Sequence, residues 1–483
     1  MSRFIPGGAL ALPALLIALG TGTAVALPAQ AAGSWSPPVQ LPAWCGGSVA
    51  VNAAGAQVAA GFGQNAGGSG SSVQVCTSAD GQTWSAPVTL AQGTSPAVAI
   101  APDGRAVAVC LCVVGKYEVV AASVRPPGGQ WSTPVDVGGG DGAPVVGIDG
   151  SGNAIAAWAG GLGAIDTASL PAGGRWTKVK TLASQSQAVG LAVNPADEAI
   201  ITWGTRFATL ADSGTVLGGF AAPVTIGPPP PYPIGYTHVA INDAGQAAAA
   251  WSGAGHNVAA TRAADGTWSP STQLSGQPGR DVDVAIDGAG DAIAVFEQVS
   301  GSVNNPITAM YASTRPAGGT WGPPVLLSAP GDSVAGTRAV ADTAGTFVVA
   351  WYDSTTQTLN VLTSPPGGGF APAATFPGVP ALSDLKIAPG HAVLTFGPPA
   401  FGPPSTHPMS IATEPVSGPH TARRIGGPPP AVRNHARALN APPRPARSPA
   451  TGKQPATTAR GSPTDHLVRR GAGRVPADRG WRA

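Results

Sequence analysis

The sequence predicts an all-β protein, a β-propeller made of four-stranded antiparallel blades. Three observations support this prediction: an aromatic residue that recurs every 44 to 53 positions, a hairpin between successive aromatics, and no helical periodicity between copies. Repetition of such a unit eight times is typical of propellers, in which each unit is one blade. A solenoid is the competing architecture, but solenoids need capping ends.

Each copy contains a short strand of the pattern W-x-x-P-V that opens on an aromatic residue. These residues are Trp35, Trp84, Trp131, Trp176, Phe220, Trp268, Trp321 and Phe370. A hairpin with an Asn/Asp-x-x-Gly turn follows, as in VAIDGAGDAIAVF. Its second strand ends at Phe62, Cys110, Trp158, Trp203, Trp251, Phe296, Trp351 or Phe396. A third strand runs into a Gly-rich turn, so each copy supplies four strands.

The ends of the repeat array differ from its interior. The last hairpin, at 384–396, and a third strand at 409–418 have no W-x-x-P-V strand after them, whereas the chain begins with an orphan copy at 35–41. We expect this N-terminal strand to complete the last blade and close the ring, which removes unpaired edges. The prediction is eight blades of about 48 residues, or seven if one degenerate copy fails to form.

Composition agrees with blades that stack face to face. The chain is 43% apolar and only 10% charged, which is ample material for a core. Runs such as AIAAW, AAAAW and VVAW place small residues beside a large aromatic. Because Trp158, Trp203, Trp251 and Trp351 recur at the same strand end, we expect them to pack between blades and not to form a ring of sugar-binding aromatics.

The first 31 residues have the pattern of a secretory signal peptide. Arg3 precedes an apolar run from Ala9 to Leu19, and Ala29-Gln30-Ala31 is a small-x-small cleavage site. Pro13 and Gly20 interrupt the run, which makes it short for a membrane anchor. We expect cleavage before Ala32, export, and no transmembrane segment in the mature protein.

The residues from 419 to 483 have a different character from the body, 32–418. Of the 26 Lys and Arg residues, 13 follow Ala422, against only Asp465 and Asp478. Many Pro and Arg and few large apolar residues predict a disordered basic tail. Such a tail could bind an acidic cell-surface polymer, but a solvated extension or a frame-shifted read-through is the stronger interpretation, and we expect no specific nucleic-acid role.

The four cysteines, Cys45, Cys76, Cys110 and Cys112, predict disulfides in an oxidising compartment. A bond between Cys110 and Cys112 is awkward in an extended strand. We therefore expect a bridge from Cys45 or Cys76 to one of that pair. The spacing does not fit zinc.

Turns such as SADGQTW (78–84), RAADGTW (262–268) and RPAGGTW (315–321) resemble degenerate Asp-box, or BNR, motifs of sialidase-like propellers. In that family the motif lies between the third and fourth strands of a blade, where these turns fall. Hairpins such as VAIDGAGDAIAVF also resemble the NHL-type repeat. The resemblance covers residues 35–418 and implies a fold more than a function.

The enzymatic part of the resemblance is not matched. Sialidases bind the substrate carboxylate with three arginines, but Arg125, Arg262 and Arg315 belong to turns on the face expected to lie away from the pocket. The aspartates Asp149, Asp287 and Asp342 are explained by turn formation. No motif of a serine hydrolase, nucleotide-binding loop or zinc protease is present, and two carboxylates in DGAGD fall short of a calcium site. We assign no catalytic residue and expect no metal or cofactor.

A binding site is expected on the loop face, where the loops from the second to the third strand, and from the fourth strand to the next blade, open around the central channel. Exposed aromatics suit stacking on sugar rings or gripping a peptide, and neighbouring polar groups could supply hydrogen bonds. Packing of these aromatics over a blade is the competing interpretation. The candidate residues are Trp44, Tyr232, Tyr236, His256, Arg280, Glu297, Asp332, Tyr352 and Asp353.

These observations predict a secreted, non-enzymatic propeller, monomeric, that binds extracellular carbohydrate or protein through its loop face. A sialidase-like glycoside hydrolase or lyase is the alternative from a different class. A structural cell-surface protein, held on an anionic envelope by its basic tail, is the third hypothesis.

Overall fold

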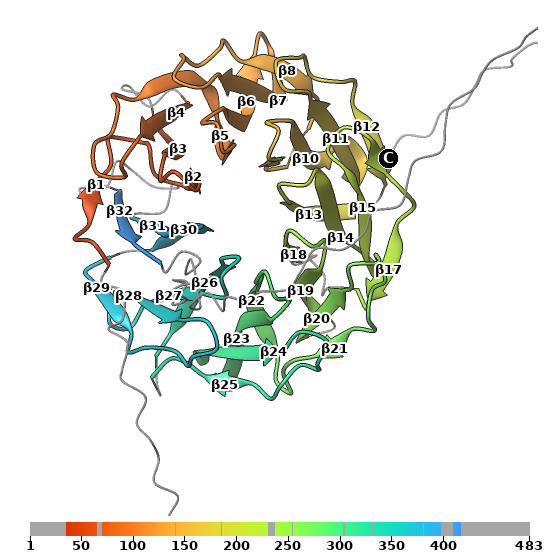
Figure 1. Ribbon diagram of the computed structural model, residues 1–483, viewed down its shortest axis with the longest axis vertical. Helices are drawn as coiled ribbons and strands as arrows, with labels where there is room; N and C mark the ends of the chain where they lie inside the picture. Colours follow the sequence, from red (N-terminus) through yellow and green to blue (C-terminus); the bar gives the residue numbers. More distant parts are fainter. Residues whose placement is uncertain are drawn as a thin grey trace, which may run out of the picture. The chain divides into compact units, whose positions relative to one another are not determined.

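Each repeat folds into antiparallel strands in the order expected from the sequence (Figure 1). The computed structural model describes residues 35–64, 70–140, 142–184, 186–229, 237–253, 255–302, 305–329, 332–379, 381–397 and 409–416. The predicted signal peptide, most of the predicted tail, and Tyr232 and Tyr236 lie outside these residues. No α-helix occurs within the described ranges, and none of their segments is a helix that could span a membrane.

Of the seven sheets that the described residues form, four have four strands contributed by one continuous stretch of chain. The first contains β9 (Val145–Ile148), β10 (Ala154–Gly160), β11 (Ala164–Leu170) and β12 (Lys180–Ala183). The second contains β18 (Thr237–Ile241), β19 (Ala247–Gly253), β20 (His256–Arg262) and β21 (Thr272–Gln273). The third contains β22 (Gly279–Ile286), β23 (Ala292–Ser302), β24 (Asn305–Arg315) and β25 (Val325–Leu326). The fourth contains β26 (Val334–Ala341), β27 (Phe347–Asp353), β28 (Thr358–Ser364) and β29 (Ala374–Pro377).

Two further sheets depart slightly from this pattern. One has five strands because its outer strand is split in two; it contains β13 (Ser186–Val193), β14 (Glu198–Thr205), β15 (Thr209–Thr215), β16 (Gly219–Phe220) and β17 (Val224–Gly227). The seven-stranded sheet contains β2 (Ser48–Val51), β3 (Gln57–Gln64), β4 (Ser71–Ser78), β5 (Val88–Ile100), β6 (Ala106–Val114), β7 (Tyr117–Arg125) and β8 (Val135–Gly138). Its 13-residue β5 pairs with both β4 and β6, so it supplies the fourth strand of one repeat and the first of the next.

The last sheet joins the two ends of the repeat array. It contains β30 (Leu382–Ala388), β31 (His391–Phe396), β32 (Ser410–Glu414) and the N-terminal β1 (Val39–Gln40). Val39 pairs with Ile411, and the Leu41 amide donates to the Met409 carbonyl at 2.9 Å. The orphan copy at the start of the chain therefore supplies the strand that the last repeat lacks.

The first strand of each repeat lies innermost (Figure 1). Each of these strands contacts the equivalent strand of the next repeat, and β30 contacts β2. The innermost strands are β2, the second half of β5, β9, β13, β18, β22, β26 and β30. Residues at the same repeat position are therefore brought to the same level around a common axis.

The Asn/Asp-x-x-Gly turns form as predicted, by a side chain that accepts hydrogen bonds from its own backbone. Asn242 Oδ1, for example, accepts from the amides of Ala244 (3.1 Å) and Gln246 (3.0 Å). Asparagine does more than aspartate at this position, because its amide also donates to the neighbouring repeat. Asn242 Nδ2 reaches the Asp287 carbonyl at 2.8 Å, and Asn194 Nδ2 reaches the Asn242 carbonyl at 3.1 Å.

The strand-end aromatics pack between sheets, as predicted. Trp158, Trp203, Trp251 and Trp351 are buried. Trp158 packs on Val107, Val109 and Val120 of the preceding repeat, and Trp351 contributes to a cluster with Ala285, Val295 and Met310 of its preceding sheet. Small residues opposite the rings allow this close approach.

The disulfide prediction was wrong. Cys45 is bonded to Cys76, and Cys110 to Cys112. The Cys45 bridge forms because the loop before β2 crosses β3 at Gly61, where an added Cβ would lie 2.5 Å from the Trp44 carbonyl. This crossing brings Cys45 to within 5.7 Å of Cys76, measured between Cα atoms.

The Cys110–Cys112 bond lies at the repeat position where the other copies have an aromatic side chain. Its Cα–Cα distance of 5.4 Å is within the range that a disulfide needs. The partner strand has a register shift between Thr94 and Ala97, so Cys110 lies opposite an irregular segment. Cys110 occupies the aromatic position of its repeat, and both sulfurs pack with Val73 of the preceding repeat.

We expect Trp158→Ala to lower the free energy of unfolding by about 3–5 kcal/mol, because it opens a cavity between two sheets. Urea unfolding followed by circular dichroism measures this loss. Val135→Ala is the control, since Val135 is 48% exposed and its removal should change stability by about 0.5 kcal/mol or less. Equal losses in both variants would contradict the packing role.

Candidate functional site

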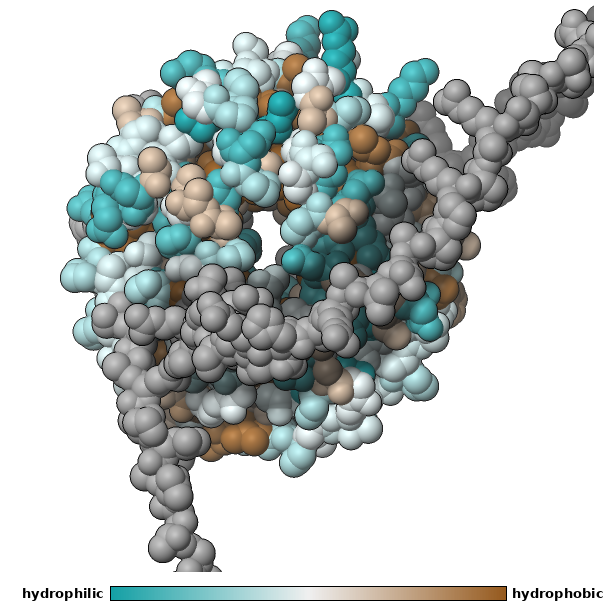
Figure 2. Space-filling view, in the orientation of Figure 1, coloured by the Kyte–Doolittle hydropathy of each residue, from teal (hydrophilic) through white to brown (hydrophobic). Residues whose placement is uncertain are grey.

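A channel of about 780 Å³ runs along the innermost strands. Its lining comes from six consecutive repeats, through β9, β13, β18, β22, β26 and β30. The opening is visible in the space-filling view, where most of the uncovered surface is hydrophilic or neutral (Figure 2). Six repeats therefore form the channel together. Its chemistry depends on the positions at which the lining residues differ between repeats.

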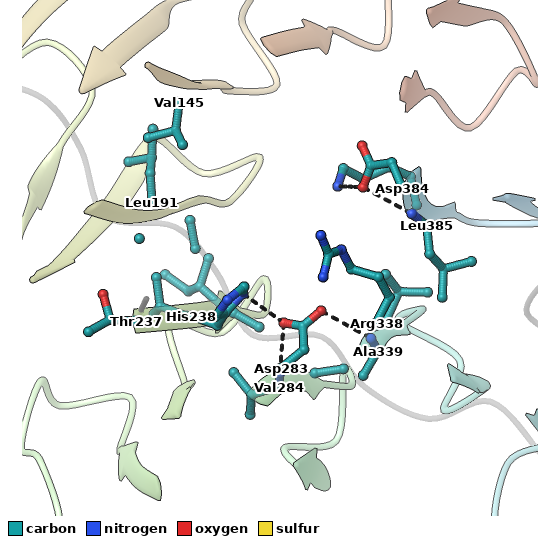
Figure 3. Close-up of a pocket in the computed structure, with 18 of the residues that line it drawn as sticks. Val145, Leu191, Thr237, His238, Asp283, Val284, Arg338, Ala339, Asp384 and Leu385 are labelled. Carbon is teal, nitrogen blue, oxygen red and sulfur yellow. Dashed lines mark hydrogen bonds and ion pairs between the residues drawn. The ribbon is translucent and has the colours of Figure 1, made fainter. Parts of the chain in front are cut away.

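One repeat position distinguishes one side of the channel from the other. It is the residue four positions before the turn Asn or Asp, as Asp283 is before Asp287. In chain order the eight copies carry Ser48, Ala97, Val145, Gly190, His238, Asp283, Arg338 and Asp384. The last four are ionisable, and they occupy adjacent strands (Figure 3). We call His238, Asp283, Arg338 and Asp384 the charged arc.

Asp283 links three repeats. Its Oδ1 lies 3.2 Å from His238 Nδ1 and accepts the Val284 amide at 2.8 Å, while its Oδ2 accepts the Ala339 amide at 3.1 Å. Burial raises the pKa of Asp283, but His238, Arg338 and the Ala339 amide outweigh that effect, so its pKa lies below the usual range. Asp283 is therefore a carboxylate at neutral pH.

Asp384 links the last repeat to the first. Its Oδ2 accepts the Val49 amide of β2 at 3.0 Å, and its Oδ1 accepts Lys386 Nζ at 2.6 Å and the Leu385 amide at 2.9 Å. Both carboxylates of the charged arc thus have their oxygens engaged by the protein, each by the amide of the next residue and by one amide of a neighbouring strand.

Arg338 has unused hydrogen-bonding capacity. Within the described residues its guanidinium donates to one acceptor, the Thr337 carbonyl at 2.7 Å, although a guanidinium carries five N–H donors. Its side chain lies between Asp283 and Asp384 and extends into the channel (Figure 3). Arg338 is therefore the member of the charged arc best placed to hydrogen-bond a ligand.

Arg280, Asp281 and Glu297 form a rim cluster where β22 and β23 approach the loop face. Arg280 and Glu297 are cross-strand partners. Asp281 reaches the next sheet, because its Oδ2 accepts the Gly336 amide at 3.2 Å. Burial, followed by the charge and hydrogen bond of Asp281, raises the pKa of Glu297 to about 8. Glu297 is only 4% exposed and its Oε1 has no partner within the described residues.

The other predicted polar residues lie near the rim cluster. The side chain of Asn257, the residue after His256, donates from Nδ2 to the Glu297 backbone carbonyl at 3.0 Å. Asp332 and Asp353 are close enough that the Asp353 charge, together with the larger effect of burial, raises the pKa of Asp332. Tyr352 precedes Asp353 on β27. Five of the six predicted polar residues therefore lie on three neighbouring sheets, β18–β21, β22–β25 and β26–β29, and Asp332 lies in the loop between β25 and β26.

Of the three predicted aromatics, Trp44 is the one that lies within the described residues. Trp44 is half-buried, and its ring lies against Gly63 of β3, where an added Cβ would overlap it. This is the packing arrangement that competed with ligand binding. Tyr232 and Tyr236 lie outside the described ranges.

Sequence reasoning missed two exposed aromatics on the loop face. Tyr117 and Phe207 are each 75% exposed, at the tips of the β6–β7 and β14–β15 hairpins. The guanidinium carbon of Arg206 lies 4.8 Å from the centre of the Phe207 ring. The sequence feature that could have identified them is an aromatic residue inside a polar turn, in VGKYE and GTRFA. Neither aromatic occupies a position that the repeat pattern explains.

The charged arc was missed as well, because its four residues lie within strands and not in loops. Its signal is present in the repeat alignment, where the arc position changes from small or apolar residues to ionisable ones after the fourth copy. Within the described ranges, no three His, Cys, Asp or Glu side chains are grouped so that they could hold a metal ion.

No protein-family model matches the sequence, and no curated protein matches it. Among solved structures, the chain is similar to the BP39L lectin from Burkholderia pseudomallei, with 15% identity, a TM-score of 0.50, and coverage of 69% of this chain and 99% of the lectin. It is also similar to the virginiamycin B lyase from Staphylococcus aureus (10% identity, TM-score 0.40, 66% of this chain and 94% of that one). The Hadza microbial sialidase Hz136 is matched at 12% identity and TM-score 0.35, over 53% of this chain and 63% of the sialidase.

These similarities concern the fold. The described residues have an all-β fold of mainly four-stranded antiparallel sheets that is similar to the fold of the lectin. The fold-level resemblance seen in the sequence is confirmed.

The raised pKa of Glu297 predicts a pH-dependent stability. Between the ordinary pKa of 4.5 and about 8, the folded chain keeps a proton that the unfolded chain releases, so the free energy of unfolding falls as the pH rises through this window. We expect Glu297→Gln to remove this loss, which is on the order of a few kcal/mol. Urea unfolding at pH 5 and pH 8.5 measures it. Glu118→Gln, which changes an exposed carboxylate, is the control, and an unchanged pH slope in Glu297→Gln would contradict the assignment.

Proposed function

We propose that this protein is a non-enzymatic, eight-bladed β-propeller that binds extracellular carbohydrate at the loop face, over the charged arc and the rim cluster. The observation that carries the proposal is the charged arc: four consecutive repeats place His238, Asp283, Arg338 and Asp384 at one level of the channel. Asp283 and Asp384 also have a structural role, so the proposal depends most on Arg338, whose guanidinium donates to one acceptor within the described residues.

The blade number rests on the strand order. Counting the two halves of the seven-stranded sheet separately, with β5 shared between them, gives eight repeats, in agreement with the eight sequence copies. The pairing of β1 with β32 and the contact of β30 with β2 support closure by the N-terminal strand. A closed propeller leaves only short outer edges and holds its loops rigidly.

The chemistry of the charged arc fits a polyhydroxylated ligand. A sugar hydroxyl is both a donor and an acceptor. Arg338 supplies donors, and the exposed part of His238 and the rim residue Arg280 lie on the same side of the channel. Tyr117 and Phe207 offer exposed rings on which the apolar face of a sugar could stack.

Binding without turnover is supported by the way the carboxylates are used. Asp283 and Asp384 hold backbone amides of neighbouring strands, so they are structural acceptors with little freedom to act on a substrate. The same proposal includes export after cleavage before Ala32, a monomeric propeller over 32–418, and a basic tail after it. A protein ligand is the alternative at this surface.

One observation favours a second function, glycoside hydrolysis or lysis. Glu297, with a pKa of about 8, would be protonated at neutral pH, as a general acid must be, and Asp281 lies beside it. Its 4% exposure means that a substrate would need the rim to open. The binding function therefore ranks first.

We expect an array of neutral and acidic oligosaccharides to reveal selective binding by the purified protein. Arg338→Gln should weaken that binding about tenfold or more, since it removes the guanidinium donors from the channel. Tyr117→Ala and Phe207→Ala should each weaken it less. Trp44→Ala and the double variant Tyr232→Ala/Tyr236→Ala test the remaining predicted aromatics.

Lys178→Gln makes the same charge change as Arg338→Gln at an exposed position near the outer strand, so it should bind like the wild type. Absence of binding to every glycan, or binding that survives Arg338→Gln unchanged, would refute the proposal.

Fluorogenic glycosides and a lyase assay at 235 nm address the second function. The binding hypothesis predicts no turnover above background. Turnover that is lost in Glu297→Gln, with the fold retained, would replace it with the enzymatic one.

A further inference from the structure

A second cavity, of about 410 Å³, lies between the sheets β22–β25 and β26–β29. It is lined by the turn residues Asp287 and Asp291 and by the end of β24 at Arg315. These belong to the hairpin-turn end of the sheets, opposite the loop face. The cavity is therefore separate from the channel, and its volume falls within the roughly 300–1,000 Å³ of ligand pockets.

The repeat explains why an aromatic ring would fit here. In most copies the W-x-x-P-V strand inserts a tryptophan between its own sheet and the preceding one. Trp321, for example, packs on a cluster that contains Ala248 and Ala250 of the preceding sheet, and Trp268 packs on one that contains Ala211. At the equivalent seam beside the cavity, the residue is Phe370. A phenyl ring stands where the neighbouring seams hold an indole.

The walls of the cavity are apolar and its rim is charged. Ile293, Leu327, Phe347 and Phe370 line it, and the last two can contact a ring with their own aromatic faces or edges. At the rim, the Arg315 side chain has no hydrogen-bond or ion-pair partner within the described residues. A guanidinium without a partner beside an apolar cleft can lie over the face of a bound ring as a cation–π contact.

The charge of the rim argues against an anionic ligand. Asp287 and Asp291 line the cavity together with Arg315, and Asp291 Oδ1 already accepts the Ala317 amide at 2.6 Å. A neutral ring avoids repulsion by these carboxylates and keeps the contact with Arg315.

We propose that this cleft, which we call the seam pocket, binds a neutral planar aromatic group of about indole size. The inference is independent of the glycan-binding function, because it concerns different residues at the opposite end of the sheets.

The test is titration of the full-length protein with indole, followed by NMR and calorimetry. Saturable binding to one site is expected. Phe370→Trp should abolish it and raise the melting temperature, because the indole of the new side chain fills the pocket as it does at neighbouring seams. Arg315→Gln should weaken indole binding about three- to tenfold, while the binding of a saturated ring of similar size, decalin, should change less.

Two matched controls complete the experiment. Arg125→Gln changes the arginine at the same repeat position, the end of β7, where the next seam holds Trp176, and it should bind indole like the wild type. Arg338→Gln should also leave indole binding intact, which separates this site from the channel. No saturable binding, or binding retained in Phe370→Trp, would overturn the proposal, as would equal effects of Arg125→Gln and Arg315→Gln.

Discussion

Every sheet in this protein must bury both of its faces against neighbouring sheets. The strands satisfy this constraint by placing large aromatics on one face and alanines or valines on the other, so that Trp158 or Phe296 fits against small residues of the preceding repeat. Dispersion and apolar burial accumulate at each seam in the same way. The Cys110–Cys112 bond meets the same need by different chemistry, since its two sulfurs fill the place of a ring.

Packing alone does not fix how far one sheet is shifted along the next. Side chains that reach across the seams supply this register. Asn194 and Asn242 donate to carbonyls of the following repeat, and Asp283 and Asp384 accept amides from it. Because a buried hydrogen-bonding group is costly to leave unpaired, each contact favours one alignment. The groups that line the channel are therefore partly structural, which leaves Arg338 as the side chain with most capacity for a ligand.

The two proposed sites arise where copies depart from the repeat. In the channel, the arc position changes from small or apolar residues to ionisable residues on adjacent strands. At the seam pocket, a phenyl ring occupies the position of an indole. In both cases the fold tolerates the change because the other repeats still pack against one another. A single repeat can therefore acquire a function without loss of the fold.

The sequence by itself determined the strands, their order, the Asx turns and the burial of Trp158, Trp203, Trp251 and Trp351, because hydrophobic alternation and turn residues act locally and are repeated eight times. It also predicted that Arg280, Glu297 and Asp353 lie near one another, because all three are in loops or at strand ends on one face. Only the tertiary structure decided the disulfide partners, the packing of Trp44 on Gly63 and the charged arc. These depend on how a loop crosses a strand and on which side chains of separate repeats meet, and such long-range distances are not encoded in local periodicity.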